Sequence, residues 1–400
     1  MRSFTYYSPT KIVFGVDAQL QVGACVSELA AKKVLIVYGS ERVVKSGLLG
    51  QVTDSLERVG VQWDKLGGVV ANPHLSLARE GVRKAIEMQA DLILAVGGGS
   101  VIDTAKCVAV GAANPQTDVW EFWSGRQKFT KARDVASVLT LAAAGSETSD
   151  SCVITNTQTG EKRGVNNDCM RPKFAIMNPE LTYSLPRKQV AAGVTDIIMH
   201  TLERYFTPIQ GNHMSDAFAE GLIRVMLRFG PVGLENSHDY EAMSEIMWAG
   251  SLSHIDLTGL GCKPPNGRAG DWATHQLGHE LSGMFDSTHG ETLSTMWGPW
   301  ARYVCDADHA RFAQLGRNVF GITGMDDVKA AHAAIDAMVA FLHDRMGMPT
   351  CFSELGIGVL PEEKIDELAD NCAFHKTRTI GAFKKLDHED IRKIYSAANR

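Results

Sequence analysis

The first part of the chain alternates short, unbroken apolar runs with amphipathic helical patterns. Residues 34–38 and 92–96 are apolar runs of strand length, while residues 44–59 and 77–88 carry apolar side chains at helical spacing. A run without polar alternation is typical of a strand buried on both faces, as in a parallel sheet covered by helices. The alternation therefore predicts an α/β domain with a parallel sheet.

This pattern ends near Leu185-Pro186. From there to Arg400 the apolar periodicity is long and helical, and few segments resemble strands. We therefore expect an α/β domain over residues 1–186 and an all-α domain over residues 187–400. A chain of 400 residues also exceeds the size at which one hydrophobic core stops growing, about 250–300 residues.

Charge and composition exclude several classes of partner. The net charge is −6, and no lysine- or arginine-rich run offers a surface for nucleic acid or an anionic membrane. No apolar run approaches the roughly 20 residues of a membrane span, and residues 1–9 lack the apolar stretch of a signal peptide. The eight cysteines include no Cys-x-x-Cys pair, which favours reduced thiols. We therefore expect a cytoplasmic protein.

A glycine-rich loop, Gly97-Gly98-Gly99-Ser100, lies between a predicted strand and the start of a helical pattern at Val101. Backbone N–H groups and the helix dipole favour phosphate at such a position. The loop is neither Gly-x-Gly-x-x-Gly, because Ile102 occupies the third glycine position, nor a Walker A loop. The alternative is a tight turn that binds no ligand.

A second loop of small residues follows the predicted strand 136–141. Thr140 near the end of this strand, and Gly145 and Ser146 in the loop of residues 142–147, could donate hydrogen bonds to a pyrophosphate or ribose. Open α/β sheets bind ligands at the carboxyl ends of their strands, so two such loops on one sheet favour a dinucleotide.

The residues behind the strand 34–38 bear on which dinucleotide is bound. Gly39 directly follows this strand, and Ser40, Arg42 and Lys45 come next. An acidic residue there would bind the ribose 2′-hydroxyl of NAD, whereas hydroxyl and cationic groups suit the 2′-phosphate of NADP. These residues favour NADP over NAD, although Glu41 weakens this interpretation. The alternative is that they are ordinary surface residues of a solvated helix.

Asp196 and His200 are four residues apart in an apolar helical stretch, so they share one helix face. A buried carboxylate needs a charge partner or a metal. The alternative for this pair alone is a hydrogen bond within the helix.

Three further histidines, His275, His279 and His289, fall within fifteen residues. The first two repeat the four-residue spacing, and Thr288-His-Gly-Glu291 resembles a capping box that would place His289 in a first helical turn. One carboxylate and three imidazoles suit Zn²⁺ or Fe²⁺. We therefore expect Asp196, His200, His275 and His289 to hold one divalent metal, with His279 beside it.

The chain resembles the iron-containing (group III) alcohol dehydrogenases, a family whose members also use zinc. The resemblance is carried by Pro9-Thr-Lys-Ile-Val-Phe-Gly15, Asn72-Pro73, Gly97-Gly-Gly-Ser-Val-Ile-Asp-Thr-Ala-Lys106, Gly145-Ser-Glu147, Asn178-Pro-Glu-Leu-Thr-Tyr-Ser-Leu-Pro186, Asp196-x3-His200 and His275-x3-His279-x9-His289-Gly290. Thr140-Leu-Ala-Ala-Ala-Gly-Ser-Glu147 and Gly39 are similar to the NADP-linked butanol dehydrogenase or aldehyde reductase branch. The departures are Ala144, where many relatives have threonine, and Asn178, where aspartate is usual.

The resemblance implies a Rossmann-like dinucleotide-binding domain, a helical metal-binding domain and, commonly, a homodimer. It implies that Asp196, His200, His275 and His289 ligate the metal, with His279 in the substrate cleft. Together with the loops above, it gives the candidate cofactor-binding residues Gly39, Ser40, Asn72, Gly97, Gly98, Gly99, Ser100, Asp103, Thr140, Leu141, Ser146 and Lys162.

The expected reaction is reversible hydride transfer between NAD(P)H and short- to medium-chain aldehydes or primary alcohols. His279 is the candidate proton relay, and its alternative is a purely steric role. Two other functions are weighed against this one. The first is a metal-dependent lyase of the dehydroquinate-synthase type, and the second is a nucleotide binder without catalysis.

Overall fold

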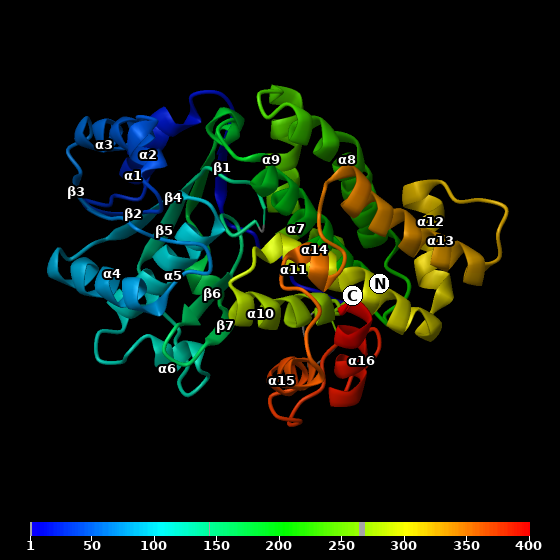
Figure 1. The fold of residues 1–400 in the computed structure, drawn as a ribbon. Coiled ribbons are helices and arrows are strands. Elements are labelled where there is room, and N and C mark those ends of the chain that lie inside the picture. The colour runs from blue at the N-terminus through cyan, green and yellow to red at the C-terminus, as the bar shows by residue number, and fades with distance from the viewer. Residues whose placement is uncertain (1, 144, 264–268) are drawn as a thin grey trace. The chain divides into compact units, whose positions relative to one another are not determined.

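A computed structural model describes residues 2–143, 145–263 and 269–400, which form two compact units (Figure 1). One unit is Tyr7–Leu185, and the other is Pro186–Arg400 together with residues 2–6. Ala144, the departure noted above, lies outside the described residues. The first unit is α/β and the second is helical, so the predicted fold class is confirmed.

The first unit is built on a six-stranded parallel sheet in the order β1-β8-β5-β4-β2-β3. Its strands are β1 (Lys11–Phe14), β2 (Lys33–Tyr38), β3 (Gln62–Leu66), β4 (Leu92–Gly97), β5 (Asp134–Leu139) and β8 (Phe174–Met177). An antiparallel hairpin forms a separate ladder from β6 (Ser151–Asn156) and β7 (Glu161–Asn166). The chain runs outward from β2 to β3 and returns to β4, so the strand order reverses between β2 and β4.

The helices of this unit cover both faces of the sheet. They are η1 (Ala18–Gln21), α1 (Val22–Glu28), α2 (Arg42–Lys45), α3 (Leu48–Glu57), α4 (Leu75–Glu87), α5 (Gly99–Ala113), α6 (Trp120–Trp123), η2 (Asp168–Met170) and η3 (Pro179–Thr182). The helical pattern of residues 44–59 is interrupted at Gly47, whose φ of 81° is left-handed, and this glycine separates α2 from α3.

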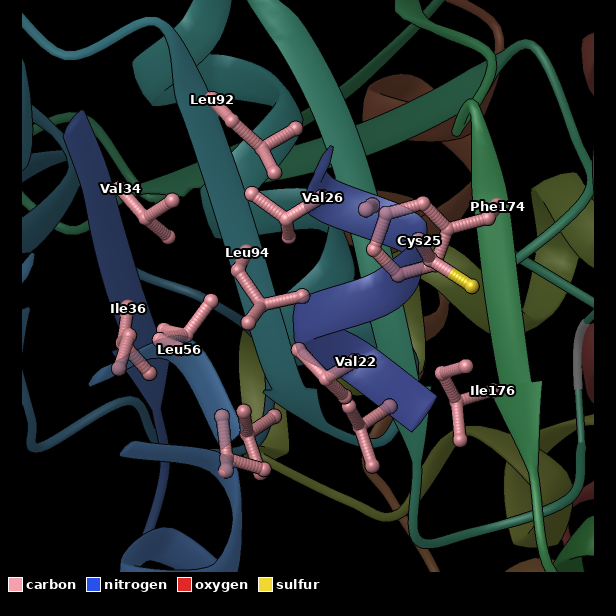
Figure 2. Close-up of a cluster of buried hydrophobic side chains, with 14 of the residues drawn as sticks. Val22, Cys25, Val26, Val34, Ile36, Leu56, Leu92, Leu94, Phe174 and Ile176 are labelled. Carbon is pink, nitrogen blue, oxygen red and sulfur yellow. The ribbon is translucent and has the colours of Figure 1, made fainter. Parts of the chain in front are cut away.

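Alternate strand residues supply the two buried faces of the sheet. Figure 2 shows Val26 of α1 beside Leu92 and Leu94 of β4, and Val34 of β2 belongs to the same buried cluster. The intervening residues, such as Ile93, are equally buried and point to the other face, where α4 and α5 pack against the same strands. Burial on both faces explains why these strands are unbroken apolar runs.

The regular elements of the second unit, in its described residues, are all helices, and one isolated β-bridge joins Ile380 to Leu386. Its helices are α7 (Arg187–Tyr205), α8 (His213–Glu235), α9 (Tyr240–His254), η4 (Leu257–Gly259), α10 (Ala273–Phe285), α11 (His289–Val304), η5 (Cys305–Ala307), α12 (His309–Phe320), α13 (Asp327–Ala340), the π-helical turn η6 (Phe341–Arg345), α14 (Phe352–Leu355), α15 (Glu362–Cys372) and α16 (His388–Ala398). Helix α7 packs against α8, α9 and α11, and most of its residues are buried. Among the described residues, no helix is both long and apolar enough to cross a membrane.

Candidate functional site

In the helical unit, three imidazoles converge on one carboxylate oxygen, Asp196 Oδ1. The Nε2 atom of His200 lies 3.4 Å from this oxygen, and the Nε2 atoms of His275 and His289 each lie 3.8 Å from it. The side chains of Asp196, His200 and His275 are at most 7% exposed, while that of His289 is 27% exposed. The structure thus brings together all four residues that the sequence proposes as metal ligands.

These separations distinguish a shared ion from direct hydrogen bonds. Direct hydrogen bonds between nitrogen and oxygen span about 2.7–3.2 Å, whereas two tetrahedral ligands bonded to one zinc ion at about 2.0–2.1 Å lie roughly 3.3 Å apart. Among the described residues, neither Asp196 Oδ1 nor His275 Nε2 has a hydrogen-bond partner, although both atoms are buried. Buried polar atoms are normally paired, so the arrangement fits a cation among them better than a hydrogen bond within α7.

The charges around the cluster also fit a cation. Burial lowers the pKa of His200 well below its usual value, and His254 and His275 add to this effect. The imidazole is therefore neutral, and the lone pair of one ring nitrogen is available to a metal ion. Burial also lowers the pKa of His275, but the carboxylates of Asp196 and Glu203 outweigh this and raise it overall. A cation would therefore replace the proton that these carboxylates otherwise hold on His275.

Glu203 is a functional residue that the sequence analysis missed. Its Oε1 accepts hydrogen bonds from the backbone N–H of His275 at 2.9 Å and from His275 Nδ1 at 2.8 Å. A carboxylate on the second ring nitrogen fixes the tautomer and directs Nε2 towards the cluster. The available signal was spacing, because Glu203 follows Asp196 by seven residues and shares its helix face.

Close backbone contacts hold α10 and α11 against α7. A Cβ atom on Gly290 would lie 2.3 Å from the carbonyl oxygen of Ala192, one turn before Asp196. Gly270, at φ 90°, would place a Cβ atom 2.2 Å from the carbonyl oxygen of Glu203. These two glycines let the segments that carry His289 and His275 approach the ligand face of α7.

The predicted capping box at Thr288 is wrong, although His289 does lie in the first turn of α11. Thr288 is the N-cap residue, but its side chain makes no capping hydrogen bond. Glu291 instead forms an ion pair with Lys188 of α7, at 2.9 Å between Oε1 and Nζ. The carboxylate of Glu291 therefore pairs with the ammonium group of Lys188 and does not cap the start of its own helix.

His279 lies beside the cluster rather than in it. Its ring centroid is 5.3 Å from that of His289 and 6.3 Å from that of His275, and the side chain is half-buried. The ring is thus close enough to act on a group held at the cluster and is partly open to solvent.

In the α/β unit, the glycine loop lies where the strand order reverses. A Cβ atom on Gly97 would lie 2.4 Å from Val101 Cγ2, and one on Gly98 would lie 3.0 Å from Leu141 Cβ. A Cβ atom on Gly39, directly after β2, would lie 3.4 Å from the same Val101 atom. Residues after three neighbouring strands therefore meet around the start of α5, at the edge of the sheet that binds ligands in such folds.

The first turn of α5 begins at Gly99, two residues earlier than the sequence pattern indicates. Gly99 and Ser100 are therefore helical, and their N–H groups belong to the helix end that favours an anion. A Cβ atom on Gly99 would meet nothing within 4 Å, so space is open beside this turn. The Thr140 backbone N–H donates to the Gly97 carbonyl at 3.1 Å and fixes the second loop against the first.

Lys106 organises the loop that follows β5. It is fully buried, and its Nζ donates to the carbonyl oxygens of Ser146, Ser149 and Ser151 at 2.7, 3.0 and 2.8 Å. Asp103 accepts from the Ser146 hydroxyl at 2.7 Å and from the Val153 backbone N–H at 2.9 Å. The Ser146 hydroxyl proton, which the sequence offers to a nucleotide, is therefore donated within the protein. Asp103 acts likewise as a support for this loop.

The remaining cofactor candidates form two small groups. Lys162 Nζ on β7 donates to Asn72 Oδ1 at 2.8 Å, so these two residues are brought together. Ser40 is exposed after β2, and Arg42 Nη1 donates to the Ser184 carbonyl at 3.3 Å. The hairpin β6–β7 and the loop at Asn72 are thus in contact.

The α/β unit carries glycine loops suited to a nucleotide, and the helical unit carries a carboxylate–histidine cluster suited to a metal. Together these features are typical of a metal-dependent oxidoreductase that uses a nucleotide coenzyme. Comparison with known families agrees with this class. The model of the iron-containing alcohol dehydrogenases matches residues 9–179, and that of the C-terminal region of the same family matches residues 190–399. The chain belongs to the iron-containing alcohol dehydrogenase family, and it is an oxidoreductase of the alcohol dehydrogenase and aldehyde reductase type.

Several relatives match over their whole length. The chain is 35% identical over 397 residues to NADH-dependent butanol dehydrogenase A of Clostridium acetobutylicum, with 99% of each chain covered. It is 34% identical over 400 residues to the NADPH-dependent aldehyde reductase YqhD of Escherichia coli, with 100% of each covered. The crystal structure of NADH-dependent butanol dehydrogenase A from Thermotoga maritima superposes with a TM-score of 0.94 at 34% identity, covering 100% of this chain and 99% of that one.

The role of Lys106 can be tested by Lys106→Met. This change leaves three buried carbonyl groups without their donor, and each unsatisfied group costs about 1–3 kcal/mol unless water enters. We expect a loss of stability on the order of 3 kcal/mol in urea unfolding, and faster amide hydrogen exchange in residues 145–151. Lys173→Met, which alters a half-exposed lysine of the same unit, is the control. Equal stability of the two variants would show that the loop does not depend on Lys106.

Proposed function

We propose that this chain catalyses reversible hydride transfer between NADPH and short- to medium-chain aldehydes or primary alcohols. The proposed site holds one divalent ion, Fe²⁺ or Zn²⁺, between Asp196, His200, His275 and His289. The observation that carries the proposal is the convergence of three imidazole nitrogens within 3.4–3.8 Å of Asp196 Oδ1. Both Asp196 Oδ1 and His275 Nε2 are buried and have no hydrogen-bond partner in the part of the chain that the structure describes.

When bound, the ion supplies a Lewis acid that polarises the carbonyl oxygen, and the nicotinamide supplies or accepts the hydride. Asp196 contributes a negative charge that offsets part of the charge of the ion. Glu203 accepts the Nδ1 proton of His275 and so keeps the Nε2 lone pair available for coordination. The burial of three of the four side chains excludes bulk water, which strengthens every electrostatic interaction there.

His279 is the proposed proton relay. Its half-buried ring lies next to that of His289, so one nitrogen can exchange a proton with a reacting oxygen while solvent restores it. In the α/β unit, Gly98, Gly99 and Ser100 present backbone N–H groups to the pyrophosphate, and Thr140, Lys162 and Asn72 bind the rest of the nucleotide.

The ligand assignment and the reaction can be tested together. We expect the wild-type protein to oxidise NADPH when butanal is added, which a lyase of the dehydroquinate-synthase type would not do. We expect His275→Ala and His289→Ala to contain about one metal ion fewer per chain than the wild type, and to lose this turnover. Elemental analysis and nicotinamide absorbance measure the two effects. Full metal content in either variant would remove that residue from the ligand set.

The support given by Glu203 predicts a smaller effect. Glu203→Gln keeps an oxygen that can accept from His275 but removes the negative charge, so we expect metal affinity to fall by about 10–100-fold. Competition with a chelator of known affinity measures the change. The control is Glu220→Gln, a buried glutamate of the same unit that accepts from Tyr205 and Gln314 instead. The role assigned to Glu203 is wrong if both variants retain metal equally well.

Coenzyme preference is proposed to depend on the residue after β2. The compared relatives include both NADH- and NADPH-dependent enzymes at nearly equal identity, so overall similarity does not decide it. Gly39 leaves room for a 2′-phosphate, and Ser40, Arg42 and Lys45 supply a hydroxyl group and positive charges beside it.

This preference can be reversed by one charge. We expect Gly39→Asp to raise the KM for NADPH at least about tenfold relative to NADH, because a carboxylate repels the 2′-phosphate and binds the 2′-hydroxyl. A Cβ atom at Gly39 would lie 3.2 Å from the Val69 carbonyl oxygen, so Gly39→Ala is needed to separate packing from charge. Steady-state kinetics with both coenzymes measure the effect. An identical change in the two variants would contradict an electrostatic cause.

A further inference from the structure

A second cluster of metal-ligating side chains lies in the helical unit, outside the site described above. Cys305 is in η5, His309 begins α12, and His332 lies in α13. Helix α11, which carries His289 in its first turn, has 16 residues and ends directly before Cys305. At 1.5 Å per residue it is about 24 Å long, so the two clusters lie at opposite ends of this helix.

The three side chains are arranged as ligands of one ion. One potential ligand atom from each of Cys305, His309 and His332 lies within 4.8 Å of the other two, the same criterion that Asp196, His200 and His275 meet. The rings of His309 and His332 have centroids 6.0 Å apart. Cys305 is buried, His309 is half-buried and His332 is exposed, so an ion can enter from solvent and still reach the thiol.

The surrounding contacts hold the cluster together. Asp306 Oδ1 lies 3.2 Å from His309 Nε2, where a carboxylate orients the ring. A Cβ atom on Gly316 would lie 3.1 Å from the Ala330 carbonyl oxygen, so α12 and α13 approach closely near His332. Arg302 of α11 forms an ion pair with Asp336 of α13 at 2.6 Å, which ties α11 to α13.

The donor set selects the kind of ion. A thiolate and two imidazoles suit Zn²⁺ and related transition metals, whereas Ca²⁺ and Mg²⁺ require oxygen ligands. Ligands of one tetrahedral zinc ion lie roughly 3.3–3.7 Å apart, so binding brings together any ligand atoms that are more widely spaced than this. The exposed side chain of His332 can supply this movement by a change of rotamer.

We propose that Cys305, His309 and His332 form a second site for Zn²⁺ or a similar transition metal, which ties the end of α11 to α12 and α13. Burial raises the pKa of the Cys305 thiol to about 11, so the thiol is neutral until an ion displaces its proton. Binding therefore forms a metal–sulfur bond and releases one proton to solvent. The proposal does not depend on the proposed catalytic function.

Cobalt(II) distinguishes this site from the first cluster. The first cluster contains no sulfur, so a thiolate-to-cobalt charge-transfer band in the near ultraviolet reports only a cysteine-containing site. Metal-free full-length protein is titrated with Co²⁺. We expect the band to saturate at about two equivalents per chain in the wild type, because the first cluster also binds one ion. In His275→Ala, which disrupts the first cluster, we expect the band to persist and to saturate at about one equivalent.

Two variants and one control complete the experiment. Cys305→Ser should abolish the band, and His332→Gln, a change at an exposed position, should weaken Co²⁺ binding by about tenfold or more. Cys169→Ser, which removes a half-buried thiol of the other unit, should leave the band unchanged. If Cys305→Ser does not fold, as judged by circular dichroism, His332→Gln decides the question. The proposal is overturned if the wild type shows no band, if the band requires a large excess of cobalt, or if neither variant changes it.

Discussion

The buried carboxylate of Asp196 is the constraint on which the helical unit depends. A negative charge in an apolar helix is costly unless it is paired. No lysine or arginine of the described residues forms an ion pair with it, and imidazole nitrogens from α7, α10 and α11 surround it instead. The neutral ring of His200 does not cancel this charge. The arrangement becomes favourable when a cation occupies the space that these side chains share.

Three neighbouring residues, Gly270, Gly290 and Glu203, meet that requirement around α7. The two glycines bring the backbones of other segments into contact with α7. The carboxylate of Glu203 orients the imidazole of His275, one of the proposed metal ligands. A second buried carboxylate so near the first would be unfavourable without a positive charge between them. An ion that binds the folded chain but not the unfolded chain would therefore stabilise the fold, in addition to its role in the proposed reaction.

Much of this could be predicted from the sequence because it depends on local periodicity. Strands buried on both faces give unbroken apolar runs, and Asp196 and His200 share a helix face by spacing alone. Contacts between distant segments left no such signal. Lys106 bonds to carbonyl groups some 40 residues later, and Glu291 leaves its own helix end for Lys188. The partner of a polar side chain depends on tertiary packing, and a short stretch of sequence does not contain this information.

The same distinction explains why family membership does not determine coenzyme choice. A solved structure of 34% identity superposes with a TM-score of 0.94, so the fold is retained at this similarity. The relatives of 34–35% identity nevertheless include enzymes named for NADH and for NADPH. The position after β2 is tightly packed, since a Cβ atom at Gly39 would meet the Val69 carbonyl oxygen at 3.2 Å. A side chain there must displace the segment after β3 by a few tenths of an ångström. A substitution at this position would change both charge and shape while the sheet is retained, and for this reason the proposed coenzyme preference is assigned to it.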